Sequence, residues 1–122
     1  GDDRLLSEFK GAFAEDYVLQ ALVPQLDVAP RYWTNEKPKY EVDFLLQIKN
    51  TIIPVEVKAG EVVDSPSLRY YTKKHAETTP LRVRFSMRNL MYNDGLLNIP
   101  LYFAHRAVPL IEAALEHGDV SR

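Results

Sequence analysis

The chain contains no cysteine, so it can form neither a disulfide framework nor a thiolate metal site. It has no apolar run near the roughly 20 residues needed to cross a bilayer. Its first residues, Gly1, Asp2 and Asp3, lack the basic and then apolar pattern of a secretion signal. Together these absences make a reducing cytoplasm the simplest expected compartment.

An excess of positive charge is also missing. The chain carries 15 Lys and Arg residues against 17 Asp and Glu residues, for a formal net charge of −2 at pH 7. Proteins that bind nucleic acid without specificity usually carry a positive excess, so the total counts mildly against that class. Acidic residues that hold a divalent cation are neutralised locally, however, and the net charge therefore leaves a nucleic-acid function open.

The sequence shows no internal repeat, low-complexity tract or Gly/Ser linker. Its 122 residues, with 26% charged and 46% hydrophobic, are typical of one globular domain. Residues 1–122 are therefore predicted to form a single domain. Because the chain begins with Gly1 and not with Met, we expect the natural protein to extend further upstream.

Hydrophobic periodicity and turn residues predict a helix, three strands, a second helix, a fourth strand and a closing helix. Ser7 is the expected N-cap of the first helix. No element is assigned over residues 89–103. The predicted helices span residues 7–22, 65–76 and 105–117, and the predicted strands span residues 31–34, 40–48, 51–58 and 81–86.

A turn at Lys49-Asn50 is predicted to join the second and third strands as a hairpin, since Asn tolerates a left-handed backbone. Its register places two acidic residues opposite partners on one sheet face: Asp43 opposite Glu56, and Glu41 opposite Lys58. Carboxylates directly opposite each other repel unless positive charge lies between them. Mg²⁺ is commonly bound through one or two carboxylates, so this pair is a candidate metal site.

The alternative is a solvent-facing polar side of the sheet, with Glu41 and Lys58 as an ordinary ion pair. Against it, Ile52 and Pro54 beside Glu56 make the third strand hydrophobic on both faces, as in an interior strand. In the first helix, Glu15 lies in the middle of the apolar stripe. Either it contributes to the same acidic site, or it reaches the edge of the helix to solvent or an arginine.

These residues match a known pattern. Glu15, then Asp43 in Glu-Val-Asp-Phe-Leu-Leu, then Glu56 and Lys58 in Pro-Val-Glu-Val-Lys, within an αβββαβ order, resemble the PD-(D/E)xK nuclease superfamily. More narrowly, five segments look like the uncharacterised C-terminal domain of bacterial and archaeal P-loop (AAA-type) ATPases: residues 10–15, 32–33, 41–45, 55–60 and 97–102. The resemblance implies a restriction-endonuclease-like α/β fold, with a central mixed sheet flanked by helices, plus a C-terminal helix.

The resemblance also implies roles for the four polar residues. Asp43 and Glu56 would bind Mg²⁺ or Mn²⁺, Glu15 would support the metal, and Lys58 would orient the attacking water or stabilise phosphate charge. Two departures stand out: Val42 replaces the Pro of the superfamily's name, and the chain has no Gly-rich phosphate loop. No ATP chemistry is therefore assigned to it, and an ATPase domain is expected upstream.

The expected function is that of a metal-dependent nuclease-like domain acting on DNA or RNA, with DNA favoured. Its rival is a non-catalytic DNA-binding or protein-interaction module attached to a P-loop ATPase. Four basic residues, Arg82, Arg84, Arg69 and Lys73, are candidates for contacts with the phosphate backbone. The alternative for them is a solvated strand face and a solvated helix face.

Overall fold

The computed structural model describes the backbone of residues 2–118 and the side chains of residues 9–118. Helices and strands follow the chain in this order: α1 (Asp2–Leu22), η1 (Val23–Gln25), β1 (Arg31–Glu36), β2 (Lys39–Ile48), β3 (Thr51–Lys58), α2 (Pro66–Lys74), β4 (Arg82–Ser86), β5 (Met91–Asn93), β6 (Leu96–Pro100), η2 (Leu101–Arg106) and α3 (Ala107–His117). None of the helices in this described part is long and apolar enough to cross a bilayer.

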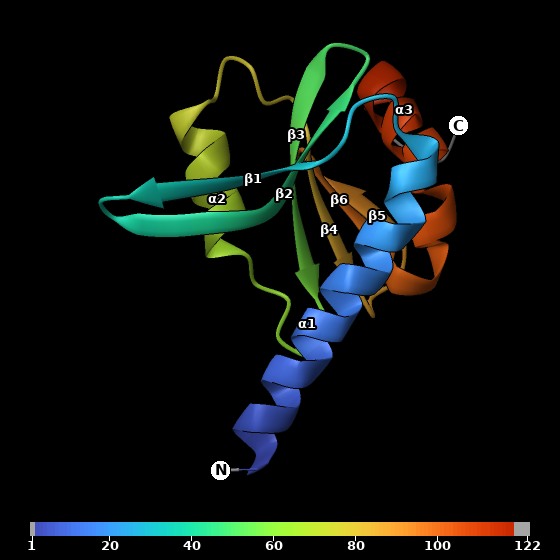
Figure 1. The fold of residues 1–122 in the computed structure, drawn as a ribbon. Coiled ribbons are helices and arrows are strands. Elements are labelled where there is room, and N and C mark those ends of the chain that lie inside the picture. Colours follow the sequence, from blue (N-terminus) through green and yellow to red (C-terminus); the bar gives the residue numbers. More distant parts are fainter. Residues whose placement is uncertain (1, 119–122) are drawn as a thin grey trace.

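The six strands form one mixed sheet in the order β1-β2-β3-β4-β6-β5. β1, β2 and β3 run antiparallel, β3, β4 and β6 run parallel, and β5 closes one edge antiparallel to β6. Helices α1 and α3 lie on one side of the sheet and α2 lies on the other (Figure 1). The predicted α/β class, with a central mixed sheet flanked by helices, is confirmed.

The two faces of the sheet bury unequal amounts of apolar surface. The larger cluster joins α1 and α3 to the sheet through residues such as Val18, Phe44, Phe85, Ile99 and Ile111. The smaller cluster, under α2, comprises Val42, Leu68 and Tyr71. Apolar burial therefore holds α1 and α3 in place, whereas the face toward α2 leaves room for polar side chains.

Three helix boundaries differ from the predicted ones. α1 begins at Asp2, so Ser7 lies inside the helix and the predicted N-cap is wrong. No proline or glycine lies between Asp2 and Ser7 to interrupt the helix. α2 ends at Lys74, two residues earlier than predicted, and the last helix starts at Ala107 after the 3-10 segment η2.

The segment that the sequence left unassigned contains two strands. β5 and β6 are joined at Asp94 and Gly95, which both have positive φ, of 49° and 79°. Asp-Gly is a favoured pair for a tight hairpin turn, because both central residues of that turn need a left-handed backbone. β6 then pairs in parallel with β4, so the sheet has more strands than expected.

The β2–β3 hairpin has the predicted turn and register. Lys49 and Asn50 have φ values of 51° and 66°, as the primed turn type requires. The strand pairs run in the predicted register from Ile48↔Thr51 to Phe44↔Val55, and the ladder ends there.

The ladder ends because β2 carries an extra residue. Arg31 and Trp33 of β1 pair with Leu45 and Val42, so two steps along β1 match three along β2. Such a bulge bends and twists its strand. The first half of β2 accordingly leaves β3 and runs with β1 alone across the sheet (Figure 1).

Two predicted cross-strand pairs lie beyond that point. Neither Asp43–Glu56 nor Glu41–Lys58 forms a backbone pair, and Glu41 pairs instead with Thr34 of β1. The predicted placement of Glu41 opposite Lys58 is therefore wrong, and with it the alternative in which they form a cross-strand ion pair, since the bulge removes the register on which both depended.

Candidate acidic site and adjoining cleft

Asp43 lies where β2 separates from β3. Its Oδ2 accepts a hydrogen bond of 2.7 Å from the backbone N–H of Val57. β3 has no partner in β2 at this position, so the carboxylate replaces the backbone carbonyl that a continuing strand would have supplied. The bond fixes Asp43 against β3 through one oxygen of its carboxylate.

Glu56 is only 7% exposed although its side chain is acidic. Its Oε2 lies 3.2 Å from Nζ of Lys58, the last residue of β3. Burial and the nearby Asp43 carboxylate raise the pKa of Glu56 to about 7, although the Lys58 ammonium acts in the opposite direction. In the metal-free protein this carboxyl is therefore only partly ionised at neutral pH.

Glu15 reaches the same place from α1. Its carboxyl is within hydrogen-bonding reach of Asp43, and both burial and the Asp43 charge raise its pKa. The pKa of Asp43 is raised too, because burial outweighs its hydrogen bond to Val57 and the charge of Lys58. The structure thus brings together all four residues of the predicted site, Glu15, Asp43, Glu56 and Lys58.

The donor set of this acidic site suits a hard divalent cation. Asp43 uses one carboxylate oxygen for the Val57 N–H and lies beside the Glu15 carboxyl, and Glu56 uses one oxygen for Lys58, so oxygens of all three acids lie where they could bind a metal. Mg²⁺ needs no more than one or two carboxylates, since water and substrate phosphate complete its shell. In the described residues, no three His, Cys, Asp or Glu side chains are arranged as a ready metal cage.

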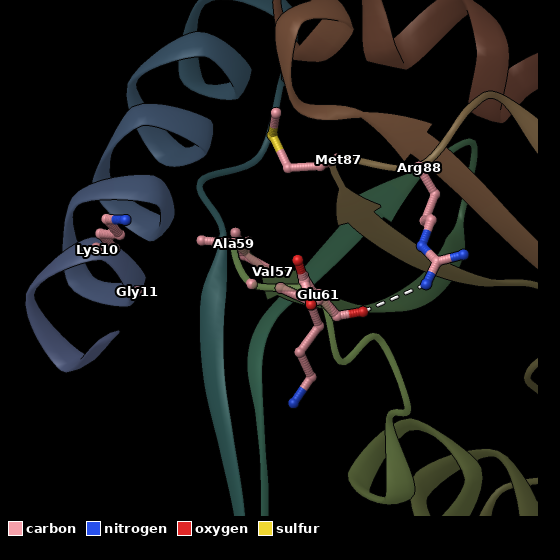
Figure 2. A pocket seen from close by; sticks show the side chains of 9 residues that line it. Lys10, Gly11, Val57, Ala59, Glu61, Met87 and Arg88 are labelled. Atoms are coloured by element: carbon pink, nitrogen blue, oxygen red, sulfur yellow. Dashed lines mark hydrogen bonds between the residues drawn. The ribbon is translucent and has the colours of Figure 1, made fainter. Parts of the chain in front are cut away.

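Beside the acidic site lies an open cleft of about 760 Å³, which we call the basic cleft. Its cationic lining residues are Lys10 on α1, Lys58 at the end of β3 and Arg88 after β4. Figure 2 shows Lys10 and Arg88 on opposite sides of the segment that contains Val57, Ala59 and Glu61. Arg88 donates a hydrogen bond of 3.3 Å to the carbonyl oxygen of Glu61. Three cations therefore surround one opening next to the paired carboxylates.

Three of the predicted phosphate-binding residues lie elsewhere. Arg82 is the first residue of β4, whereas Lys58 pairs with Ser86 at the other end of that strand. The Arg82 guanidinium donates a hydrogen bond to the carbonyl oxygen of Asp94. Arg69 of α2 pairs with Asp64, and Lys73 is exposed in the last turn of α2. The structure does not bring these residues into the basic cleft, and their contact with nucleic acid stays a prediction.

Arg84, the fourth of them, is 8% exposed and held by the protein. Its Nε donates to Oδ1 of Asn98 at 2.8 Å, and its Nη1 donates to the carbonyl oxygen of Val63 at 3.0 Å. The Ser86 hydroxyl donates to the same Asn98 oxygen at 2.6 Å. Burial lowers the pKa of Arg84, with the neighbouring Arg88 and Arg82 charges acting in the same direction. These bonds direct Arg84 into the sheet and not toward a solvent-borne phosphate.

Neither the polar network of Arg84, Ser86 and Asn98 nor the place of Lys10 in the cleft was predicted from the sequence. Asn98 carried a signal, because it stands alone as a polar residue in the apolar strand Leu96–Pro100. Such an isolated buried amide must satisfy both its oxygen and its nitrogen. Lys10 carried none, since nothing local to α1 shows that its side chain meets the end of β3.

Comparison with curated proteins gives no match. Residues 10–103, which include the acidic site and all six strands of the sheet, match the protein family described as Domain of unknown function (DUF4143). The matched range covers most of the chain, and the chain therefore belongs to this family.

Proposed function

We propose that this chain is a metal-dependent phosphodiesterase domain of the PD-(D/E)xK type, acting on nucleic acid, with DNA favoured over RNA. The observation that supports it is the placement of two carboxylates from neighbouring strands, the half-buried Asp43 and the buried Glu56, beside the Lys58 ammonium. Leaving two like charges together is unfavourable, and a divalent cation between them would offset that repulsion.

A bound Mg²⁺ would supply a more acidic water and would neutralise phosphate charge. Asp43, fixed by the Val57 amide, and Glu56, supported by β3, would hold the ion. Lys58 both touches Glu56 and lines the basic cleft, so its ammonium can face a phosphate oxygen as negative charge develops there. Glu15 would accept a hydrogen bond from water on the α1 side of the site. Hydrolysis then adds water across one P–O bond, and the departing oxygen takes up a proton.

The competing proposal is a non-catalytic module attached to a P-loop ATPase. It draws support from the narrower resemblance, from the pairing of Glu56 with Lys58, and from the absence of a ready three-group metal cage among the described residues. DUF4143 domains often occur together with AAA ATPases, which fits either proposal.

Two substitutions separate these proposals. Asp43→Asn should abolish the rise in melting temperature that Mg²⁺ produces in the parent, and with it all cleavage, because a charged ligand is lost. Lys58→Met should keep the Mg²⁺-dependent rise but slow single-turnover cleavage by about 100-fold or more. Both are measured by thermal melting with and without Mg²⁺ and by cleavage of several DNA forms.

Lys49→Met is the matched control. Lys49 lies at the β2–β3 turn, where its Nζ is 3.6 Å from Glu112 and 3.8 Å from Glu116 of α3. It should leave cleavage unchanged. A parent that shows neither stabilisation by Mg²⁺ nor cleavage, together with an Asp43→Asn variant that unfolds, would make the acidic site a structural network and favour the non-catalytic module.

A further inference from the structure

One face of α1 exposes aromatic side chains to solvent. Phe9, Phe13 and Tyr17 follow one another four residues apart and are 66%, 68% and 45% exposed. The rings of Phe9 and Phe13 stack with their centroids 6.4 Å apart. The three side chains line an apolar groove of about 410 Å³, which Met87 and Leu101 complete from the sheet side. We call this surface the aromatic groove, and contiguous apolar surface of this kind marks a binding site.

The aromatic groove is continuous with the basic cleft. Lys10, Ala59 and Met87 line both. The other two cations of the cleft are sequence neighbours of residues that line both openings: Lys58 precedes Ala59, and Arg88 follows Met87. Glu61 is the one acidic residue among those lining the cleft, against three cations, Lys10, Lys58 and Arg88. A ligand in the groove therefore meets positive charge along one side.

We propose that the aromatic groove binds unpaired bases of single-stranded nucleic acid, whose phosphates lie in the basic cleft. This rests on the proposed function and names its substrate class. Aromatic side chains beside a cationic channel are the means by which proteins bind single strands, since every base offers a face for stacking. A duplex keeps its bases inside and presents phosphates on its outside, so the apolar groove would contribute nothing to holding it. The adjacent cations favour this occupant over an apolar peptide.

The test measures binding of a fluorescein-labelled oligothymidylate, roughly 15 nucleotides long, by anisotropy in EDTA so that nothing is cleaved. Phe9→Ala with Phe13→Ala should weaken this binding about 10-fold or more while leaving its salt dependence unchanged. Lys10→Gln with Arg88→Gln should weaken it and also flatten the salt dependence. Binding of a duplex of the same length should be insensitive to the Phe substitutions.

Two further variants keep the test specific. Tyr102→Ala removes an aromatic side chain that is 60% exposed and lines neither opening, and it should bind as the parent does. Phe9→Leu with Phe13→Leu keeps an apolar groove but removes the stacking rings, so it should also weaken binding of the single strand. Circular dichroism checks that each variant is folded.

Parent-like binding by folded Phe→Ala variants would overturn the inference. So would Phe substitutions that change only self-association in sedimentation, which would make the groove an interface between protein copies. Single-strand binding that needs the rings, without cleavage in Mg²⁺, supports the inference and refutes the proposed function. If the protein cleaves duplexes in Mg²⁺, the Phe substitutions do not affect this cleavage, and single-strand binding does not depend on the rings, the proposed function is supported and the inference is refuted.

Discussion

Two sets of polar side chains inside this domain differ in how their charges are compensated by neighbouring groups. The guanidinium of Arg84 is a single buried charge surrounded by neutral acceptors from Asn98 and Val63. Asp43, which is half-buried, and Glu56, which is buried, are like charges, and burial and the Asp43 charge raise the pKa of Glu56. The hydrogen bonds of Arg84 are supplied by the protein itself. In the acidic site, three carboxyl groups face one ammonium group, so negative charge is in excess. The contrast indicates that the network stabilises the fold, and it supports the proposal that the acidic site binds a cation.

Removing Asn98 should produce the largest loss of stability. Its Oδ1 accepts from Arg84 and Ser86, and its Nδ2 donates to the carbonyl oxygens of Arg88 and Asn89. Asn98→Ala leaves the buried Nε of Arg84 and the buried Ser86 hydroxyl without their shared acceptor, so we expect it to lower the free energy of unfolding by about 3 kcal/mol in urea denaturation.

Asn93→Ala is the control for that experiment, because Asn93 is exposed on β5 and should change stability by less than about 0.5 kcal/mol. A loss below about 1 kcal/mol for Asn98→Ala would contradict the view that the network is structural. The Arg84, Ser86 and Asn98 network would then not be what distinguishes the structural set of polar side chains from the acidic site.

An intermediate effect should appear in the pH dependence of the metal-free protein. In the unfolded chain Glu56 releases its proton near pH 4.5, whereas in the folded protein it holds the proton to about pH 7. The unfolded state therefore binds fewer protons between these values, and stability falls as the pH rises through this window. We expect Glu56 to account for about 1 to 2 kcal/mol of that fall, since solvent still reaches part of the site.

Glu56→Gln should flatten this slope, as measured by urea denaturation in EDTA at several pH values from 4 to 8. Part of the slope should remain, because the pKa values of Glu15 and Asp43 are raised as well. If parent and variant lose stability equally with rising pH, Glu56 does not carry a repelled charge in the folded protein.

The smallest expected change in stability is at Asp43, which accepts a hydrogen bond from Val57 and also places a negative charge beside Glu56. Asp43→Asn keeps an oxygen to accept from the Val57 N–H and removes the repulsion with Glu56. In EDTA it should therefore be as stable as the parent, or more stable by up to about 1 kcal/mol. Asp43→Ala removes the acceptor as well and should be less stable by about 1 to 2 kcal/mol. Destabilisation of Asn and Ala variants alike would show that the negative charge itself holds β2 against β3.

Local patterns were sufficient to predict several parts of the structure. Asn50 tolerates positive φ, so the turn and register of the β2–β3 hairpin follow from the sequence. The same holds for the stop of α3 at Gly118, whose φ is 64°. These features depend on residues a few positions apart, where the backbone preferences of single residues decide the outcome. The meeting of Glu15, Asp43, Glu56 and Lys58 was also expected, from the register and the family resemblance.

The long-range arrangement was decided by tertiary packing. The bulge in β2 ends the ladder at Phe44, so Asp43 reaches Val57 through its side chain and Lys58 pairs with Glu56 in place of Glu41. Likewise, the parallel pairing of β4 with β6 buries Arg84 against Asn98, although alternation alone left Arg84 open to solvent. Periodicity gives each strand its two faces, but which neighbour covers a face depends on contacts between segments that are distant in the chain. Those contacts form only when the whole core packs.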